Sequence, residues 1–247
     1  AKGVIAEDHP YYAGTLDMAC NQFVWDFLSG ADLILAAGLG RRMGALTESR
    51  PKPLLAVGGR AIIDHVLDRV VEADIGHAVI NLHYGAALLR RHLDSRKKPA
   101  LDFSDESDAL LDTGGGVAKA LPLLGEEPFF VINGDVMWID GMGNALHALA
   151  ARFEVAQMDA LLLLQPTVSA VGYGGIGDFS MAPNGQLFRR GEKDVTPFVH
   201  TGIQILHPDI FKDCPQGAFS LNKIYDKAAE QGRLFGLRHQ GHWMELN

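Results

Sequence analysis

The sequence predicts an α/β fold with a doubly wound, mainly parallel sheet. Short apolar runs alternate with segments whose apolar residues recur at helical spacing, from about residue 33 to residue 164. Such alternation is typical of βαβ units with right-handed crossovers. Two of the apolar runs end in glycine-containing polar turns, and ligands of these sheets bind beyond the carboxyl ends of the strands. We therefore expect a binding crevice at that edge.

The predicted elements follow one another in a regular order. The first strand is the apolar run LILAA at 33–37, which indicates a buried strand. Further strands are expected at 77–82, 100–103, 128–132, 159–164, 200–206 and 233–237. Helices are expected at 62–71, 86–93, 115–121, 144–155 and 221–231. The glycine-rich stretch 172–191, with β-like pieces at 178–181 and 186–189, predicts a small β-rich hairpin or lid region.

Composition excludes several classes of protein. The chain has 247 residues, 47% of them hydrophobic, and can bury a sizeable core. No apolar run approaches the roughly 18 residues that span a membrane, and the first residues lack the apolar core of a signal peptide, so a cytoplasmic location without membrane contact is expected. The net charge of −8 argues against nucleic-acid binding. The two cysteines have neither metal-ligand nor disulfide spacing.

A positively charged loop follows the first strand. Residues 38–60 contain five basic residues and one acid, a local balance of +4 in a chain of net charge −8. Gly38 and Gly40 let backbone N–H groups approach an anion. The dinucleotide fingerprint fails at its third glycine, where Met43 stands, and the phosphate loop of many ATPases is absent. The loop therefore suits a nucleoside triphosphate by a different motif.

That motif, L-A-A-G-x-G-x-R-M followed by P-K-P-L, resembles the signature of the sugar-1-phosphate nucleotidyltransferases. The segments GGIGDFS, HTGIQILHPDIF and GAFSLNKIYDKA extend the resemblance over roughly residues 32–246. It implies a Rossmann-like fold. It also implies attack of a sugar 1-phosphate on the α-phosphorus of a nucleoside triphosphate, with pyrophosphate leaving. Positioning and charge stabilisation dominate such phosphoryl chemistry.

The resemblance assigns catalytic cations to this loop. It puts Arg42 on the triphosphate and the leaving pyrophosphate, and Lys52 beside the α-phosphate and the incoming sugar phosphate. Arginine suits a planar bidentate contact and lysine acts as a mobile point charge. Ala37, Gly38 and Gly40 are expected to bind the nucleotide with Arg42. A solvated charged loop is the alternative interpretation of any such run of cations.

Asp135 is the third predicted catalytic residue. It follows an apolar strand in the turn Asn133-Gly134-Asp135, where Asn133 and Gly134 are expected to contact substrate. Mg²⁺ prefers a few carboxylate oxygens together with phosphates and water, and in the resembling family this aspartate binds the metal. The alternative is a turn aspartate that caps its own loop.

A second glycine motif, LDTGGG at 111–116, precedes VAKALPLLG. It resembles the L-E-T-G-G-G-I stretch of N-acetylmuramate-1-phosphate uridylyltransferases, with Asp112 where glutamate is usual. The resemblance implies that Thr113 and Gly114 help to bind the nucleotide, because the helix that follows presents its N-terminus to an anion or a base edge. A simple glycine-rich helix entry is the alternative. Thr201 lies in a strand expected to border the sugar pocket.

The last residues depart from the family pattern. HWMELN aligns with H-W-x-D-V-G-T, whose aspartate is a second metal ligand, so Glu245 is the expected second ligand here. Its side chain is one methylene longer, and the chain stops where Gly-Thr would follow, as if the C-terminus were truncated. Because an octahedral Mg²⁺ site tolerates misplacement poorly, we expect a weakened metal site.

Residues 1–31 are expected to form an N-terminal extension of foreign character before a catalytic domain at 32–247. Residues 1–38 resemble a central-domain segment of thiamine-diphosphate enzymes of the acetolactate synthase type, and 15–29 is expected to be an amphipathic helix. Since none of the thiamine-binding parts follows, we expect no thiamine chemistry.

The sequence thus predicts a Mg²⁺-dependent enzyme that joins a sugar 1-phosphate to a nucleoside triphosphate. The best specific interpretation is a uridylyltransferase acting on N-acetylmuramic acid 1-phosphate and UTP, which implies a role in recycling cell-wall peptidoglycan. The alternatives are a mannose-1-phosphate guanylyltransferase and a catalytically impaired nucleotide-sugar-binding module. The expected partners are small molecules, and the oligomeric state is not predicted.

Overall fold

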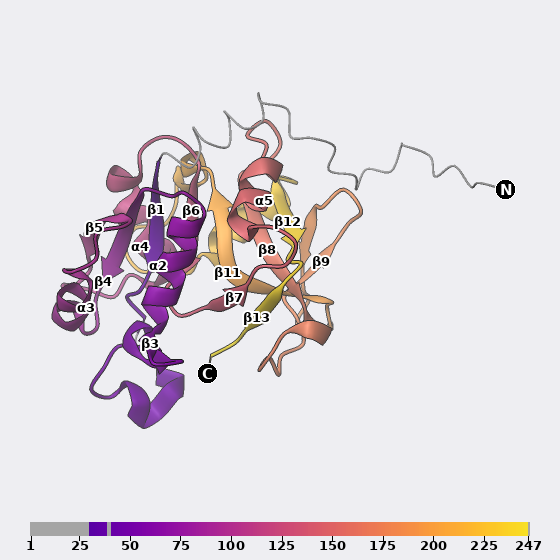
Figure 1. The fold of residues 1–247 in the computed structure, drawn as a ribbon. Coiled ribbons are helices and arrows are strands. Elements are labelled where there is room, and N and C mark those ends of the chain that lie inside the picture. The colour runs from indigo at the N-terminus through magenta and orange to yellow at the C-terminus, as the bar shows by residue number, and fades with distance from the viewer. Residues whose placement is uncertain (1–29, 39–40, 247) are drawn as a thin grey trace.

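The computed structural model describes residues 30–38 and 41–246 (Figure 1). The predicted helix at 15–29 and Gly40 lie outside these residues. Within them the fold is α/β, as predicted, with helices on both faces of a large sheet.

The described part of the chain contains a nine-stranded sheet in which the order β10-β9-β11-β6-β1-β4-β5 is extended by β8 and β12 beside β11. Its strands are β1 (Ala31–Leu35), β4 (His77–Leu82), β5 (Ala100–Asp105), β6 (Phe129–Asn133), β8 (Ala160–Pro166), β9 (Phe179–Met181), β10 (Leu187–Arg189), β11 (Phe198–Leu206) and β12 (Leu234–Arg238). The pairs β1–β4, β1–β6, β4–β5 and β8–β12 are parallel, whereas β11 is antiparallel to its neighbours. The mainly parallel sheet is therefore confirmed.

The helices are α2 (Ile62–Glu72), α3 (Ala86–Leu93), α4 (Asp112–Leu124), α5 (Ala145–Arg152) and α6 (Asn222–Glu230). They divide between two core clusters. The apolar residues of α2, α3 and α5 pack into one cluster, and those of α4 and α6 into the other. Successive residues of β1 alternate between them, Leu33 in one and Ile34 in the other, because strand side chains point to opposite faces. This is the layered arrangement of a doubly wound fold.

Several short elements were not predicted. They are the 3₁₀ turns η1 (Arg41–Thr47), η2 (Lys52–Leu54), η3 (Thr167–Ser169) and η4 (Pro208–Phe211), and the small two-stranded sheets β2 (Ala56–Val57) with β3 (Arg60–Ala61) and β7 (Met137–Ile139) with β13 (His242–Met244). The last pair matters most, because it joins the C-terminal residues to the segment after β6 (Figure 1). The predicted hairpin at 172–191 is present as β9 and β10.

None of the helices in the described residues is long and apolar enough to cross a membrane.

Asp32 is an unusual residue in the core. Its side chain is almost fully buried in β1, where Oδ1 accepts a hydrogen bond from the Phe130 N–H at 2.7 Å. Oδ2 has no partner within the described residues. Burial raises the pKa of this carboxyl from 3.8 to about 8, although the Phe130 hydrogen bond opposes the rise. Asp32 is therefore protonated in the folded protein over a pH range in which the unfolded chain has lost the proton.

This difference makes stability depend on pH. Between about pH 4 and pH 8 the folded state binds one more proton than the unfolded state at this site, so the free energy of unfolding falls as the pH rises. The asparagine of Asp32→Asn stays neutral at every pH, so the variant should lack this pH-dependent fall in the free energy of unfolding. Relative to the parent, the Tm of Asp32→Asn should rise by roughly 5–10 °C between about pH 5 and about pH 8 in calorimetry. An equal Tm difference at both pH values would contradict the assignment.

Candidate active site

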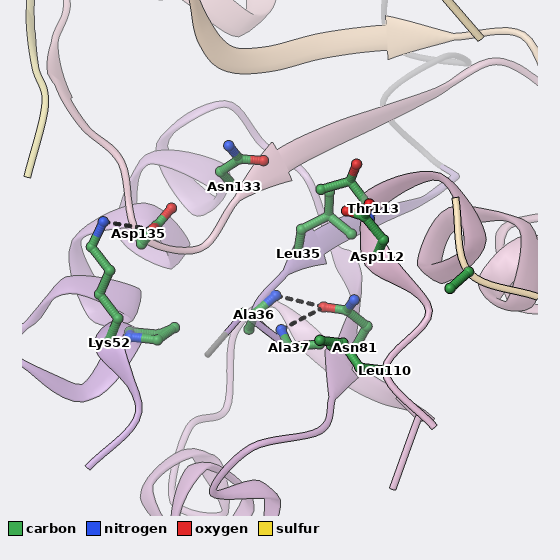
Figure 2. A pocket seen from close by; sticks show the side chains of 13 residues that line it. Leu35, Ala36, Ala37, Lys52, Asn81, Leu110, Asp112, Thr113, Asn133 and Asp135 are labelled. Carbon is green, nitrogen blue, oxygen red and sulfur yellow. Dashed lines mark hydrogen bonds and ion pairs between the residues drawn. The ribbon is translucent and has the colours of Figure 1, made fainter. Parts of the chain in front are cut away.

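A cavity of about 440 Å³ lies beyond the carboxyl ends of β1, β4 and β6 (Figure 2). It is lined by residues from six separate parts of the chain, namely Leu35, Ala36, Ala37, Gly38, Lys52, Pro53, Asn81, Leu110, Asp112, Thr113, Asn133, Asp135 and Ala218. The parallel pairing of β1 with β6 sets Leu35 opposite Asn133. The loop after the first strand and the N-G-D turn therefore meet at one edge of the sheet, as predicted.

Lys52 and Asp135 form an ion pair in this cavity. Lys52 begins the short turn η2 between two prolines, and its Nζ lies 2.8 Å from Asp135 Oδ2 (Figure 2). The lysine side chain is only 10% exposed, whereas that of Asp135 is 33% exposed. A buried ammonium group requires a partner, because its desolvation is otherwise costly. The pair thus puts a fixed positive charge beside a carboxylate that a ligand can reach.

The sequence analysis did not find Asn81. This buried side chain on β4 accepts hydrogen bonds, through Oδ1, from the N–H groups of Ala36 and Ala37 (Figure 2). Its amide nitrogen donates to Glu106 Oε1 at 2.8 Å. The signal for Asn81 was a polar residue inside the apolar run HAVINL. One amide therefore fixes the chain direction just before the glycine loop.

Glu106 extends this support to the second glycine motif. It is fully buried, and its Oε2 accepts from the Leu111 N–H at 3.4 Å. Burial raises the pKa of the carboxyl, while the hydrogen bonds from Asn81 and Leu111 oppose that rise. A Cβ on Gly116 would lie 2.8 Å from Glu106 Oε1, so glycine is needed there for close approach. The network links the walls formed by β1 and α4.

The N-G-D turn is held by close packing. Gly134 donates its N–H to the Leu35 carbonyl at 2.8 Å, and a Cβ at this position would come within 3.2 Å of that oxygen. Asn133 lies beside the β-bulge of β11, where Gly202 has a φ of +81°. A Cβ at Gly202 would meet Asn133 Nδ2 at 2.6 Å. Glycine at position 202 therefore leaves room for the Asn133 side chain.

The opposite end of the cavity is formed by the start of α4. The Asp112 carboxylate accepts from the Thr113 N–H at 2.6 Å, and the Thr113 hydroxyl accepts from the Leu221 N–H at 2.9 Å. The Gly114 N–H donates to the Phe219 carbonyl at 2.8 Å. Because that amide already has a partner, Gly114 supports the wall rather than presenting a free donor, and its nucleotide-binding role stays a prediction.

A second cavity, of about 290 Å³, shares Lys52, Asn133 and Asp135 with the first. Its other walls come from the β9–β11 region and β13, with Tyr173, Asp178, Val199, His200, Thr201, Gly202, Trp243, Met244, Glu245 and Leu246, and from Val136. Antiparallel pairing sets Met244 opposite Met137, which brings Glu245 to the cavity that Asp135 also lines. The two predicted metal ligands thus share one cavity. The described residues contain no cluster of three or more His, Cys, Asp or Glu suited to a metal ion.

Two polar residues of this second cavity differ in what they offer a ligand. The Thr201 hydroxyl donates to the Leu163 carbonyl at 2.8 Å, so it supports the wall. His200 Nε2 is buried without a partner in the described structure. Burial lowers the pKa of the His200 imidazole to about 4, and the nearby Asp178 only partly opposes this shift. His200 is therefore neutral at pH 7, so its imidazole adds no charge to the cavity that it lines.

Of the remaining predicted residues, Ala37 and Gly38 line the first cavity, with the Ala37 N–H directed to Asn81. Arg42 lies in η1, in the segment that leads to η2. Tyr84 holds that segment, because its hydroxyl contacts the carbonyls of Thr47 and Glu48 at 2.9 and 2.7 Å.

The Nucleotidyl transferase family model matches residues 31–244, which include every residue lining these two cavities except Glu245 and Leu246. The chain belongs to this family. The match begins at the first residue of β1 and includes the glycine loop, the N-G-D turn and β13. The prediction of a sugar-1-phosphate nucleotidyltransferase family member is confirmed.

Individual relatives of the chain belong to the same class of enzymes. The chain is 41% identical over 218 residues to N-acetylmuramate alpha-1-phosphate uridylyltransferase of Caulobacter vibrioides, covering 87% of this chain and 90% of that protein. It is 27% identical to the mannose-1-phosphate guanylyltransferase catalytic subunit beta of Xenopus tropicalis, and the match covers 87% of this chain and 60% of that protein. The resemblance to the uridylyltransferases is confirmed, and the guanylyltransferase is more distant.

Among solved structures, the inositol-1-phosphate CTP transferase from T. maritima superposes with a TM-score of 0.72 at 16% identity, covering 89% of each chain. At this level of identity the likeness supports the fold.

The Asn81 network leads to a testable prediction. Asn81→Ala removes the acceptor of the Ala36 and Ala37 N–H groups and leaves buried Glu106 with one hydrogen bond fewer, so it should destabilise the protein by about 2–4 kcal/mol. The pKa of Glu106 should rise further in the variant. The free-energy loss should therefore be larger at about pH 8 than at about pH 5, since the folded variant retains a proton that the unfolded chain releases.

Urea unfolding at both pH values measures this effect. Asn222→Ala is the matched control, because Asn222 is exposed at the start of α6. A loss below about 1 kcal/mol, or one independent of pH, would show that the network does not hold this edge of the sheet.

Proposed function

We propose that the protein is a uridylyltransferase that joins N-acetylmuramic acid 1-phosphate to UTP, releasing pyrophosphate. The observation that carries the proposal is the Lys52–Asp135 pair at the junction of two cavities. A reaction between two substrates needs two adjoining spaces that share the reacting groups. The larger cavity suits the nucleotide, and the smaller suits the sugar phosphate. The identity to the Caulobacter vibrioides enzyme supports this choice of substrates.

Lys52 has the central role in this proposal. Its ammonium group is held on the shared wall, where the α-phosphate and the incoming sugar phosphate would meet. A prepositioned cation stabilises charge that develops on the phosphate oxygens without reorganising in the transition state. The ion pair with Asp135 keeps the ammonium group aimed at this junction. Arg42, in the loop before η2, would bind the triphosphate and the leaving pyrophosphate.

Ala37, Gly38, Gly40 and Thr113 would complete the nucleotide site. Asn133, with the backbone of Gly134, would contact the sugar phosphate, and the strand residue Thr201 would border the sugar. His200 and Asp178, which the sequence analysis did not single out, add polar groups to the sugar side. The backbone N–H of His200 donates to Asp178 Oδ2 at 2.9 Å, which fixes that carboxylate.

The donor set fits a Mg²⁺ ion. Asp135 and Glu245 supply carboxylates to one cavity, and Mg²⁺ commonly uses one or two carboxylates while keeping waters and substrate phosphates. When bound, the ion would neutralise charge on the phosphate oxygens. The carboxylate of Asp135 would hold it in exchange for part of its contact with Lys52. Glu245 is the second proposed ligand.

A domain limited to residues 32–247, preceded by a separate segment at 1–31, is part of the same proposal and agrees with the start of the family match at residue 31. The cytoplasmic location, the role in peptidoglycan recycling and the expected absence of nucleic-acid partners stay predictions.

Substrate preference tests the proposal directly. Pyrophosphate release should be at least about tenfold faster, as kcat/KM, with UTP and N-acetylmuramic acid 1-phosphate than with GTP and mannose 1-phosphate. Lys52→Met should lower kcat by about 10²–10³ with little change in fold, because it removes charge stabilisation of the transition state. Lys97→Met, at an exposed position, is the control.

A preference for GTP would replace the proposal with the guanylyltransferase alternative. Binding of UTP with no turnover at any Mg²⁺ concentration would favour the impaired binding module.

The metal ligands are tested separately. Asp135→Asn and Glu245→Gln should each raise the Mg²⁺ concentration for half-maximal activity by about tenfold or more. Asp178→Asn is the matched control, because its carboxylate lines the same cavity but accepts from His200 N–H. That variant should change the KM for the sugar phosphate and leave the Mg²⁺ dependence unchanged. An unchanged Mg²⁺ dependence in Glu245→Gln would remove Glu245 from the metal site.

A further inference from the structure

A third cavity, of about 990 Å³, lies outside the candidate active site. Its walls are the end of α5, the turn between β9 and β10, the end of β12, and the segment that links β12 to β13. Figure 1 shows these elements gathered on the same side of the molecule. Neither Lys52 nor Asp135 lines this cavity, and no step of the proposed reaction uses it.

The lining is positively charged although the chain as a whole is negative. Its positive charges are those of Arg152 and Arg238, beside the imidazoles of His239 and His242, and the described lining has no aspartate or glutamate, in a chain of net charge −8. Both arginines are exposed. Arg152 donates a hydrogen bond to the Asn184 carbonyl at 3.3 Å, and within the part of the chain that is described neither guanidinium forms an ion pair with a carboxylate. Two guanidinium groups are thus available to an anion.

The cavity also has a buried polar wall. His239 is 4% exposed, and its Nδ1 lies 3.0 Å from the Oε1 of buried Gln165, whose amide nitrogen donates to the Ser169 hydroxyl at 2.8 Å. His239 Nε2 is buried without a partner in the described residues. Asp140 acts on His239 electrostatically, but its carboxylate accepts from Ala145 N–H and does not line the cavity. Buried polar atoms normally have partners, so this wall has unmet hydrogen-bonding capacity.

The charge and the size together indicate the ligand class. Arginine binds phosphate oxygens with a planar, bidentate geometry. A phosphate monoester carries nearly two negative charges at pH 7, which match two permanent positive charges better than one carboxylate does. Cavities of roughly 300–1,000 Å³ hold small organic molecules. We propose that this cavity binds a phosphorylated small molecule of the size of a nucleotide or sugar phosphate, through Arg152, Arg238 and His242.

The site is connected to the candidate active site by one strand. His242, at the start of β13, lines the third cavity, whereas Trp243 and Glu245 line the cavity that Asp135 shares. A ligand held by His242 therefore contacts the strand that the proposed second metal ligand, Glu245, directly follows.

NMR titration of the full chain tests the proposal, because glycine amides report on each site separately. Gly185, Gly236 and Gly241 line the third cavity, while Gly38 lines the nucleotide cavity and Gly134 lies in the N-G-D turn beside it. The probes are inorganic phosphate, UMP and acetate. Phosphate and UMP should shift the three cavity glycines with saturation, and acetate should bind at least about tenfold more weakly.

The double variant Arg152→Gln/Arg238→Gln should raise the Kd of phosphate at these glycines by about tenfold or more. The double control Arg91→Gln/Lys97→Gln removes the same charge at exposed positions elsewhere, and it should change the Kd by less than about twofold. Ala182→Glu is a second test. It adds a negative charge to the cavity wall while both arginines stay in place, so it should also raise the Kd of phosphate.

Three results would overturn the proposal. They are shifts confined to Gly38 and Gly134 in the parent protein, an unchanged Kd in both cavity variants, and acetate binding as tight as that of phosphate. Uridylyl transfer is not a readout in this experiment, so the substrate assignment stands or fails independently.

Discussion

The parallel pairing of β1 with β6 is the constraint on which the candidate site depends. It sets Leu35 beside Asn133, so the glycine loop and the N-G-D turn leave the sheet at neighbouring points although almost a hundred residues separate them. The Gly134 N–H then bonds to the Leu35 carbonyl and extends the pairing by one step. Since the strands are buried on both faces, a register slip would exchange their side chains between the two core clusters. The hydrophobic core thus fixes the relative position of the polar groups.

The Asn81 side-chain amide continues the hydrogen bonding of the sheet beyond the end of β1. Asn81 satisfies two backbone N–H groups at the point where β1 ends and the sheet can no longer supply acceptors. The Glu106 carboxylate accepts one hydrogen bond from the Asn81 amide nitrogen and another from the Leu111 N–H. A buried carboxylate is costly unless several donors surround it, which explains why this network is compact and why Gly116 must lack a side chain. These few contacts tie the segment after β1 to β4 and to the start of α4 at the wall of the first cavity.

Most of the sheet and all five described α-helices could be predicted from the sequence, because their apolar residues follow clear strand or helix periods. The strand at 77–82 and the helix at 86–93 match β4 and α3 residue for residue. The short turn η2 and the strands β7 and β13 were missed, since three residues are too few to show a period. Lys52 and Asp135 were found from motifs, and their proximity followed from the rule on strand ends.

Site residues that stand as single polar side chains within apolar strands could not be found from periods or motifs in the sequence. Asn81 and His200 lie inside strands, where one polar residue among apolar neighbours does not reveal which groups it will meet. The partner of the Gly114 amide, the Phe219 carbonyl, lies about a hundred residues away, and no local pattern encodes that contact. Long-range hydrogen bonds of this kind depend on the assembled fold.

The pairing of β7 with β13 has a geometric consequence for the two carboxylates beyond its strands. Asp135 lies two residues before β7, and Glu245 comes directly after β13, so a backbone ladder of three residue pairs sets the span between their Cα atoms. The backbone at this position cannot shift without breaking the ladder. The extra methylene of a glutamate at position 245, relative to an aspartate, must therefore be accommodated by the side-chain rotamers of the two acids and not by the backbone.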